Sequence, residues 1–140
     1  MANLFLFEVH TPYRLFFSGK VEGITVNLPD GEIGIYAGHS FITAPVLTGI
    51  LKIRDDTGVW KPAYTSEGIL EVSGHKTILM VDAAEWPGEI DPERAESAKT
   101  RAQERIGTGA LKFDTDNARL DLKRAETRLK VYALRADASS

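Results

Sequence analysis

The hydrophobic pattern of this chain changes once, near residue 90, and no other sequence feature restricts the fold as strongly. Short runs of β-branched and aromatic residues separated by turn residues come before that point, whereas Ala, Leu, Arg, Lys and Glu recur at helical spacing after it. Ten of the 12 glycines lie before residue 90; residues 1–90 carry 6 basic and 11 acidic side chains (net −5), and residues 91–140 carry 11 basic and 9 acidic (net +2). We therefore predict a β domain over residues 1–88 and a helical domain over residues 89–140.

The first half has the pattern of an antiparallel β-sandwich. Turn signals such as Pro29-Asp30-Gly31 separate the apolar runs at intervals of about 8–12 residues, the spacing typical of sandwiches and barrels. The predicted strands are Leu4–His10, Arg14–Phe17, Gly23–Asn27, Glu32–Tyr36, Leu47–Arg54, Val59–Ser66, Ile69–Val72 and Lys76–Ala83. Strands joined by short connections pair antiparallel, and two facing sheets are needed to bury their apolar sides.

The second half is predicted to form two helices packed as an antiparallel hairpin. Asp91 is an N-cap residue and Pro92 fits the first helical position, where its missing N–H costs nothing. Small and apolar residues then recur three and four positions apart in a first helix that ends at Gly107–Gly109, and in a second helix that begins within Asp114–Asp116. The predicted facing stripes are Ala95, Ala98, Ala102 and Ile106 in the first helix and Ala118, Leu122, Ala125, Leu129, Tyr132 and Ala136 in the second. Because the contacts between the two stripes are made largely by small side chains, we expect the hairpin to be the less stable and more movable half. We also expect a frayed end at Asp137–Ser140.

Composition excludes several classes of chemistry. The chain has 140 residues and no cysteine, so it is too short for a multidomain enzyme and has no disulfide, Cys-ligated zinc, iron–sulfur cluster or thiol nucleophile. Its histidines, His10, His39 and His75, lie in separate segments without metal-ligand spacing, and neither a phosphate-binding loop nor a nucleophile-elbow motif occurs. We therefore expect no catalytic site and no metal site, and an interaction or regulatory role.

Targeting signals and charge give expectations about location and partners. The N-terminal segment MANLFLFEVH has only four consecutive apolar residues and no basic start, which is too short for a signal-peptide core. No apolar run approaches the length that spans a bilayer. A soluble, cytoplasmic protein is expected, with membrane association made only through a partner. The formal net charge of −3 argues against nucleic-acid binding.

One segment is specific enough to indicate a family. Residues 31–40, GEIGIYAGHS, resemble the G-E-[IL]-G-[VI]-x-x-G-H segment of the epsilon subunit of bacterial F-type ATP synthases, whose mitochondrial counterpart is called delta. Further matches are Val9–Pro12 (V-x-T-P), Thr48–Ile53 (G-x-[LMV]-x-I) and Glu71-Val72, so the resemblance spans essentially the whole chain. It implies an α+β fold with segregated halves: an antiparallel β-sandwich of about ten strands, followed by a two-helix antiparallel hairpin.

The resemblance implies a non-catalytic role in a rotary complex. Members of this family sit on the central stalk of a proton- or sodium-translocating ATP synthase, where the sandwich binds the gamma subunit and the c-ring and couples rotation to ion flow. In bacterial members the hairpin either folds against the sandwich or extends into the alpha/beta head, where it inhibits ATP hydrolysis. The implied location is peripheral, at the cytoplasmic face of the bacterial inner membrane, through the complex.

The resemblance also implies a regulatory ATP site, used with or without magnesium, and no required cofactor. Ile90–Ala95 matches the I/L-D-x-x-R-A motif by which some bacterial epsilon subunits bind ATP in the folded-down form, and Leu122–Leu129 contains the family's K-R-A-x-x-R-L. The residues implicated are Glu85, Ile90, Asp91, Arg94, Ala95, Arg101, Arg124 and Arg128. Guanidinium groups bind phosphate oxygens through paired charge-assisted hydrogen bonds, which suits a triphosphate. The alternative is that Asp91 and Pro92 mark only a helix start, and that Trp86 changes the approach to the pocket.

Two groups of residues are candidates for binding partner subunits. They are His39, Phe41 and Ile42 in the sandwich, and Arg119, Lys123 and Arg135 in the second helix. The histidine resembles a family position near gamma, with an ordinary turn histidine as the alternative. The two apolar residues form partner surface or, as the alternative, ordinary core. The basic residues meet acidic segments of the β subunits if the hairpin extends, or form a solvated face with pairs such as Asp121 with Arg124.

Two other functional classes are alternatives to a stalk subunit. A free-standing ATP-sensing regulatory protein would use the same arginines without a rotary complex, and copurification with gamma separates the two. A carbohydrate-binding β-sandwich enzyme would need paired carboxylates in a cleft, a pattern that Glu32, Glu67 and Glu71 do not show.

Overall fold

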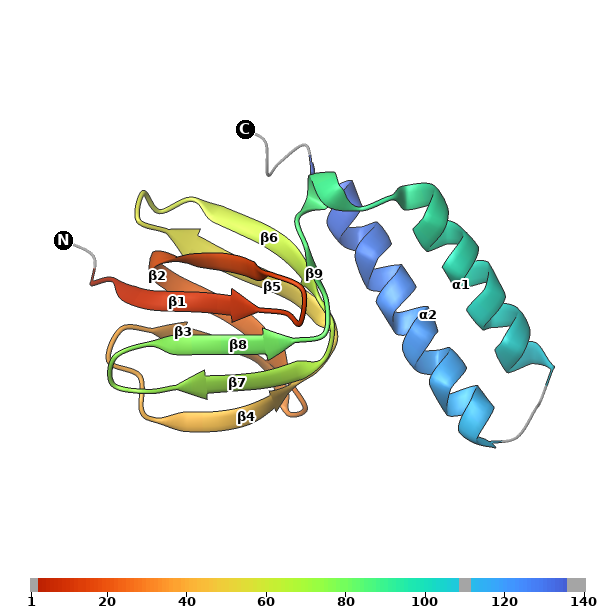
Figure 1. Cartoon of the computed structure of the whole chain (residues 1–140), viewed down its shortest axis with the longest axis horizontal. Coiled ribbons are helices and arrows are strands. Elements are labelled where there is room, and N and C mark those ends of the chain that lie inside the picture. The colour runs from red at the N-terminus through yellow and green to blue at the C-terminus, as the bar shows by residue number, and fades with distance from the viewer. Residues whose placement is uncertain (1–2, 109–111, 136–140) are drawn as a thin grey trace.

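The computed structural model describes residues 3–108 and 112–135 of the chain. A β-sandwich comes first and a helical hairpin second, as the change of pattern near residue 90 predicts (Figure 1). The strands are β1 (Phe5–His10), β2 (Leu15–Leu28), β3 (Gly31–Tyr36), β4 (Ile42–Val46), β5 (Gly49–Asp55), β6 (Trp60–Thr65), β7 (Gly68–Val72), β8 (Thr77–Val81) and β9 (Ala84–Glu85). The helices are the 3-10 helix η1 (Pro87–Glu89), α1 (Pro92–Gly107) and α2 (Lys112–Ala133).

The long strand β2 belongs to both layers of the sandwich. Its first part pairs with β1 through Val21, and its second part, from Gly23 onward, pairs with β3 and β5. One layer therefore has the strand order β4-β7-β8-β1-β2, and the other has the order β3-β2-β5-β6-β9. The structure describes nine strands. Because β2 belongs to both layers and is counted in each, the sandwich has ten strand segments. This confirms the sandwich that the resemblance implies.

Three details of the strand prediction are wrong. The predicted strands Arg14–Phe17 and Gly23–Asn27 are parts of the single strand β2, because the polar residues between them remain paired with β1. β4 was missed because Pro45 weakens its strand signal; a proline is tolerated there because β4 is an edge strand that pairs only with β7. The pair β1–β8 is parallel, since no short turn links these two strands and sets their direction.

The turns between strands agree with the sequence. Gly31 ends the β2–β3 turn with a φ of 130°, a conformation that residues with a Cβ avoid. Inward-facing residues of both layers then form the sandwich core, and the largest that are fully buried are Phe7, Ile24, Ile35, Leu51, Ile53, Leu70 and Leu79.

The hairpin helices pack through alanines. Ala95 and Ala102 of α1 and Ala118 and Ala125 of α2 are buried, which confirms these positions of the two predicted stripes. α2 begins at Lys112, slightly before its predicted start. The predictions for Gly109, Ala136 and Asp137–Ser140 lie outside the described residues.

The second helix has another buried face, which the single predicted stripe does not include. α2 lies between α1 and the sandwich (Figure 1). Its Val131 is fully buried in a cluster with Tyr64 of β6 and Ile90, and its Thr127 is also buried. The hairpin is therefore docked on the sandwich in this structure.

An arginine fork fixes the segment that leads from the sandwich into the hairpin. Arg14 donates from both terminal nitrogens to the carboxylate of Glu89, at 2.8 and 2.9 Å, and also donates to the carbonyl oxygen of Ala84 at 3.1 Å. The hydrogen bonds from Arg14 hold the pKa of Glu89 below its ordinary value. This fork ties η1 to Arg14, the residue before β2, just ahead of the N-cap of α1.

Candidate functional site

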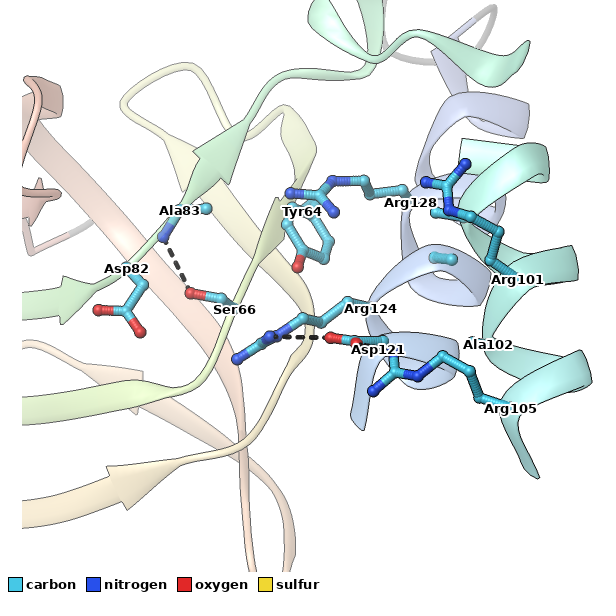
Figure 2. Close-up of a pocket in the computed structure, with 12 residues that line it drawn as sticks. Tyr64, Ser66, Asp82, Ala83, Arg101, Ala102, Arg105, Asp121, Arg124 and Arg128 are labelled. Atoms are coloured by element: carbon cyan, nitrogen blue, oxygen red, sulfur yellow. Dashed lines mark hydrogen bonds and ion pairs between the residues drawn. The ribbon is translucent and has the colours of Figure 1, made fainter. Parts of the chain in front are cut away.

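Two adjoining hollows, each of about 370 Å³, lie where the hairpin meets the sandwich. The inner hollow is lined from the sandwich by Tyr64, Ser66, Asp82 and Ala83, and from the helices by Arg101, Arg105, Asp121, Arg124 and Arg128, among others (Figure 2). The outer hollow is lined by Glu85, Glu89, Asp91, Arg94, Ala95, Ala98, Arg101 and Arg128. Because Ala98, Arg101 and Arg128 line both, we treat the two hollows as one region, the arginine cleft.

The structure brings together most of the residues predicted to contact ATP. Those that line the outer hollow are Glu85, Asp91, Arg94, Ala95, Arg101 and Arg128. Arg124 lines the inner hollow instead. Ile90 lines neither, because its side chain is buried against Tyr64 and Val131. The candidate set therefore occupies one region, with Ile90 supporting it from below the surface.

The start of α1 is capped as the sequence predicts. Oδ1 of Asp91 accepts a hydrogen bond from the backbone N–H of Arg94 at 3.1 Å, and Pro92 occupies the first helical position. Arg94 follows in the first turn and Arg101 two turns later, so both arginines reach the cleft from the same helix. The capping role of Asp91 is thus shown by geometry, independently of any ligand.

Replacing Asp91 separates its capping role from its charge. We expect Asp91→Ala to destabilise the first turn of α1 by about 1 kcal/mol, whereas Asp91→Asn keeps the cap because asparagine caps as well as aspartate. Hydrogen exchange of the amides of Arg94 and Ala95 measures this difference. Equal exchange in the alanine variant and the wild type would contradict the capping role.

Two arginines of α2, Arg124 and Arg128, reach across to the sandwich and are bound there. Nε of Arg128 donates to Oε1 of Glu85 at 2.8 Å, and its guanidinium lies 4.4 Å from the centre of the Tyr64 ring. Arg124 binds the carboxylate of Glu67 and also donates to Oδ1 of Asp121 at 3.3 Å. In Figure 2 the two arginines extend from α2 on either side of Tyr64. These contacts join α2 to β6, β9 and the β6–β7 connection.

Burial and charge shift two pKa values beside the cleft. Burial raises the pKa of Tyr64 to about 12, although the neighbouring Arg128 and Arg124 oppose the shift. Partial burial raises the pKa of Glu67, but the hydrogen bonds from Arg124 and Thr48 outweigh it, so the pKa lies below the ordinary 4.5. The stability that the Glu67–Arg124 pair contributes is therefore fully present above pH 4.5 and is lost as pH falls through the lowered pKa.

The arginines of α1 are less completely paired. Nη1 of Arg105 donates to Oδ2 of Asp121 at 2.7 Å. Within the part of the chain that the structure describes, Arg94 and Arg101 have no carboxylate at ion-pair distance. A guanidinium with unused donors at the edge of a hollow binds phosphate or carboxylate oxygens. The arginine cleft is thus chemically suited to an anion.

Comparison with known proteins decides the family. The beta-sandwich domain model of the ATP synthase delta/epsilon chain matches residues 4–87, and the long alpha-helix domain model of the same chain matches residues 89–133. This chain belongs to the ATP synthase delta/epsilon family. The resemblance seen in residues 31–40 is thereby confirmed.

Several members of the delta/epsilon family are similar over most of their length. The ATP synthase epsilon chain of Caldanaerobacter subterraneus subsp. tengcongensis is 43% identical over 132 residues, which cover 94% of this chain and 95% of that protein. The ATP synthase epsilon chain of Clostridium novyi is 40% identical over 126 residues, 90% of each chain.

Two solved structures share the delta/epsilon fold. A chain of the Euglena gracilis mitochondrial ATP synthase superposes with a TM-score of 0.69 at 19% identity, covering 98% of this chain and 82% of that one. A chain of the central stalk and c-ring structure of Tetrahymena thermophila mitochondrial ATP synthase has a TM-score of 0.55 at 15% identity, covering 94% of this chain and 95% of that one. In this family member, none of the described helices has the length and hydropathy to cross a membrane.

The candidate partner residues of this family member lie in two places. Phe41 is 77% exposed, so interpreting it as core is wrong, whereas Ile42 packs against the sandwich core. Nδ1 of His39 lies 2.8 Å from the carbonyl oxygen of Ser40 in the turn before β4. Arg119 and Lys123 are exposed on α2, and Arg135 is exposed two residues after α2 ends. The predicted pair of Asp121 with Arg124 is present, and Arg135 covers the ring of Tyr132.

Sequence reasoning missed several residues of the arginine cleft. Tyr64, Arg105 and Asp121 line the inner hollow but carry no motif, and they come together only because α2 packs against both the sandwich and α1. Glu67, which binds Arg124 from outside the hollow, was missed as well. Spacing alone indicates one of them, because Arg105 follows Arg101 at a helical interval. The expected influence of Trp86 is not seen: its ring stacks on Phe16, with centroids 4.4 Å apart, and lines neither hollow.

Proposed function

We propose that this chain is the epsilon subunit of a bacterial F-type ATP synthase, with no catalytic step of its own. Family membership supports this role, and so do relatives described as ATP synthase epsilon chain that match over nine-tenths of both chains. In this proposal the chain joins the central stalk and acts at the cytoplasmic face of the membrane through the complex. The complex translocates protons or sodium ions.

The sandwich is the part proposed to bind the gamma subunit and the c-ring. Its surface carries large apolar side chains that are exposed in the isolated chain, among them Phe41, Tyr36, Ile69 and Met80. Ile69 and Met80 are cross-strand partners on β7 and β8, so they form adjoining apolar surface. Exposed apolar surface of this kind is typical of protein interfaces.

The docked hairpin is proposed to be the state that ATP stabilises. The observation that carries this proposal is the arginine cleft, in which Arg94 and Arg101 of α1 and Arg124 and Arg128 of α2 line adjoining hollows. A triphosphate bound there would interact with both helices at once, and would therefore favour the docked arrangement over any extended one. ATP is a regulatory ligand in this proposal and not a substrate.

Inhibition of ATP hydrolysis is proposed to require release of the hairpin. The extended hairpin would reach the alpha/beta head, where the exposed basic residues of α2 would meet acidic segments. Its docking depends on one apolar cluster and two ion pairs to the sandwich, Arg124 with Glu67 and Arg128 with Glu85. Such a limited interface suits a switch between two sets of partners.

A calorimetric titration with ATP, with and without magnesium, tests the regulatory site. We expect saturable binding at or below millimolar ATP, and a loss of at least roughly 30-fold in affinity in Arg124→Ala/Arg128→Ala, because two charge-assisted contacts are removed. The matched control is Arg119→Ala/Arg135→Ala, which removes one exposed arginine of α2 and one just after its end, both outside the cleft.

Either of two results would contradict the ATP site. One is the absence of heat up to several millimolar ATP together with unchanged NMR shifts of the α1 and α2 amides. The other is an equal loss of affinity in the control double variant, which would make the effect one of overall charge. The hairpin would then be controlled by something other than ATP.

A further inference from the structure

The side chain of Glu67 already forms an ion pair with one of the arginines that line the arginine cleft. This residue connects β6 and β7, and its carboxylate binds Arg124 through both oxygens, one at 3.4 Å from Nε and the other in contact with Nη2. Both side chains are about one-third exposed, so the pair is only partly screened by water.

A second contact holds the carboxylate in place. Oγ1 of Thr48, in the β4–β5 connection, donates to Oε2 of Glu67 at 2.6 Å, and Thr48 is itself 5% exposed. A buried donor on one side and a guanidinium on the other leave Glu67 little freedom to turn away. The carboxylate is therefore part of the resting geometry of the site.

A carboxylate and a phosphate compete for the same guanidinium. Both present two oxygens at a spacing that matches the nitrogens of arginine, and each such fork uses the same donors. Arg124 lines the inner hollow, whereas Glu67 does not, so the carboxylate holds this guanidinium from the sandwich side. An anion in the hollow would have to draw Arg124 away from it.

We infer that Glu67 is an internal competitor of the triphosphate for Arg124, and that it sets the affinity of the cleft for ATP. This inference rests on the proposed ATP-regulated function. Without nucleotide, the Glu67–Arg124 pair keeps the hairpin docked. When ATP binds, Arg124 exchanges the carboxylate for phosphate oxygens, and the loss of the Glu67–Arg124 pair offsets part of the binding free energy. ATP then binds less tightly than the arginines alone would allow.

The test compares the ATP affinity of the full chain and of Glu67→Gln by calorimetry. We expect the variant to bind ATP roughly five- to tenfold more tightly, because Arg124 then gives up no charged partner when it binds the phosphate. The control is Glu71→Gln, the same change at an exposed position of β7 away from the cleft, which should leave the affinity unchanged. In an Arg124→Ala background, Glu67→Gln should change the affinity less than about twofold, because the contested guanidinium is gone.

A second variant tests the inference in case Glu67→Gln undocks the hairpin. Thr48→Val keeps the charge of Glu67 and the shape of residue 48 but removes the hydroxyl that orients the carboxylate, so roughly twofold tighter ATP binding is expected. NMR contacts between Val131 and Tyr64 report in each variant whether the hairpin is still docked.

The outcomes separate this inference from the proposed function. Tighter binding in Glu67→Gln that disappears in the Arg124→Ala background supports it. Equal or weaker binding in a docked Glu67→Gln, with the wild type still binding ATP, overturns the inference and leaves the regulatory site intact. If wild type, Glu67→Gln and Thr48→Val all fail to bind ATP at several millimolar, the proposed site and the inference fail together.

Discussion

Gly68→Ala is expected to destabilise the sandwich by about 3 kcal/mol, which lowers the melting temperature by roughly 10 °C. A Cβ at Gly68 would lie 1.9 Å from the backbone carbonyl oxygen of Met80 and 2.7 Å from Cγ1 of Val81. The first contact is with backbone, so no side-chain rotation relieves it, and β7 would have to separate from β8. Thermal unfolding followed by circular dichroism measures the effect.

Gly88→Ala is the matched control for this prediction. Among the described residues, and apart from the two chain neighbours of Gly88, no atom lies within 4 Å of the position that a Cβ at Gly88 would take, so alanine is accommodated there without a clash. We expect its melting temperature to stay close to that of the wild type. Equal melting temperatures for Gly68→Ala and Gly88→Ala would show that the β7–β8 contact is less tight than the structure indicates.

Val131→Asp is expected to release the hairpin while the sandwich stays folded. Val131 is fully buried against Tyr64 and Ile90, in a cluster separate from the sandwich core. A carboxylate there is either buried without a partner or protonated, and each costs about 3 kcal/mol or more. Because the apolar cluster and two ion pairs hold α2 on the sandwich, this penalty is large enough to favour undocking.

Hydrogen exchange resolved by residue measures this release. We expect the amides of α2 to lose protection while those of β1, β2 and β8 keep it, and ATP binding to be lost with docking. Leu120→Asp is the control, since Leu120 is an exposed position of the same helix. If the α2 amides of Val131→Asp remain as protected as those of the wild type, the hairpin is held by contacts other than this cluster.

The local features of the chain were predictable because they depend on neighbouring residues. The change of period near residue 90, the turn glycine at Gly31 and the cap at Asp91 each act within a few positions of the chain. Each is present in the structure as expected. The family was predictable for a similar reason, since GEIGIYAGHS is one continuous segment.

The candidate site was only partly predictable. Arg94, Arg101, Arg124 and Arg128 were identified from motifs within single helices. The carboxylate that binds Arg124 was not identified, because Glu67 lies far away in the sequence, in a segment that carries no charge pattern of its own. Glu85, the partner of Arg128, was implicated by the family resemblance. The second buried face of α2 also escaped prediction, since the predicted stripe of alanines toward α1 masks the shorter face that contains Val131.

The sequence by itself determined the two-part fold, the start of α1 and the family, because periodicity, capping and short motifs are local properties. Only the tertiary structure decided which arginines are already paired and which are not, because that depends on how α2 docks on the sandwich. The Arg14–Glu89 fork holds the segment that leads into the hairpin, and the contact of Val131 with Tyr64 holds α2 itself. Both are contacts between residues more than 60 positions apart, and their strength comes from burial and geometry that no local pattern contains.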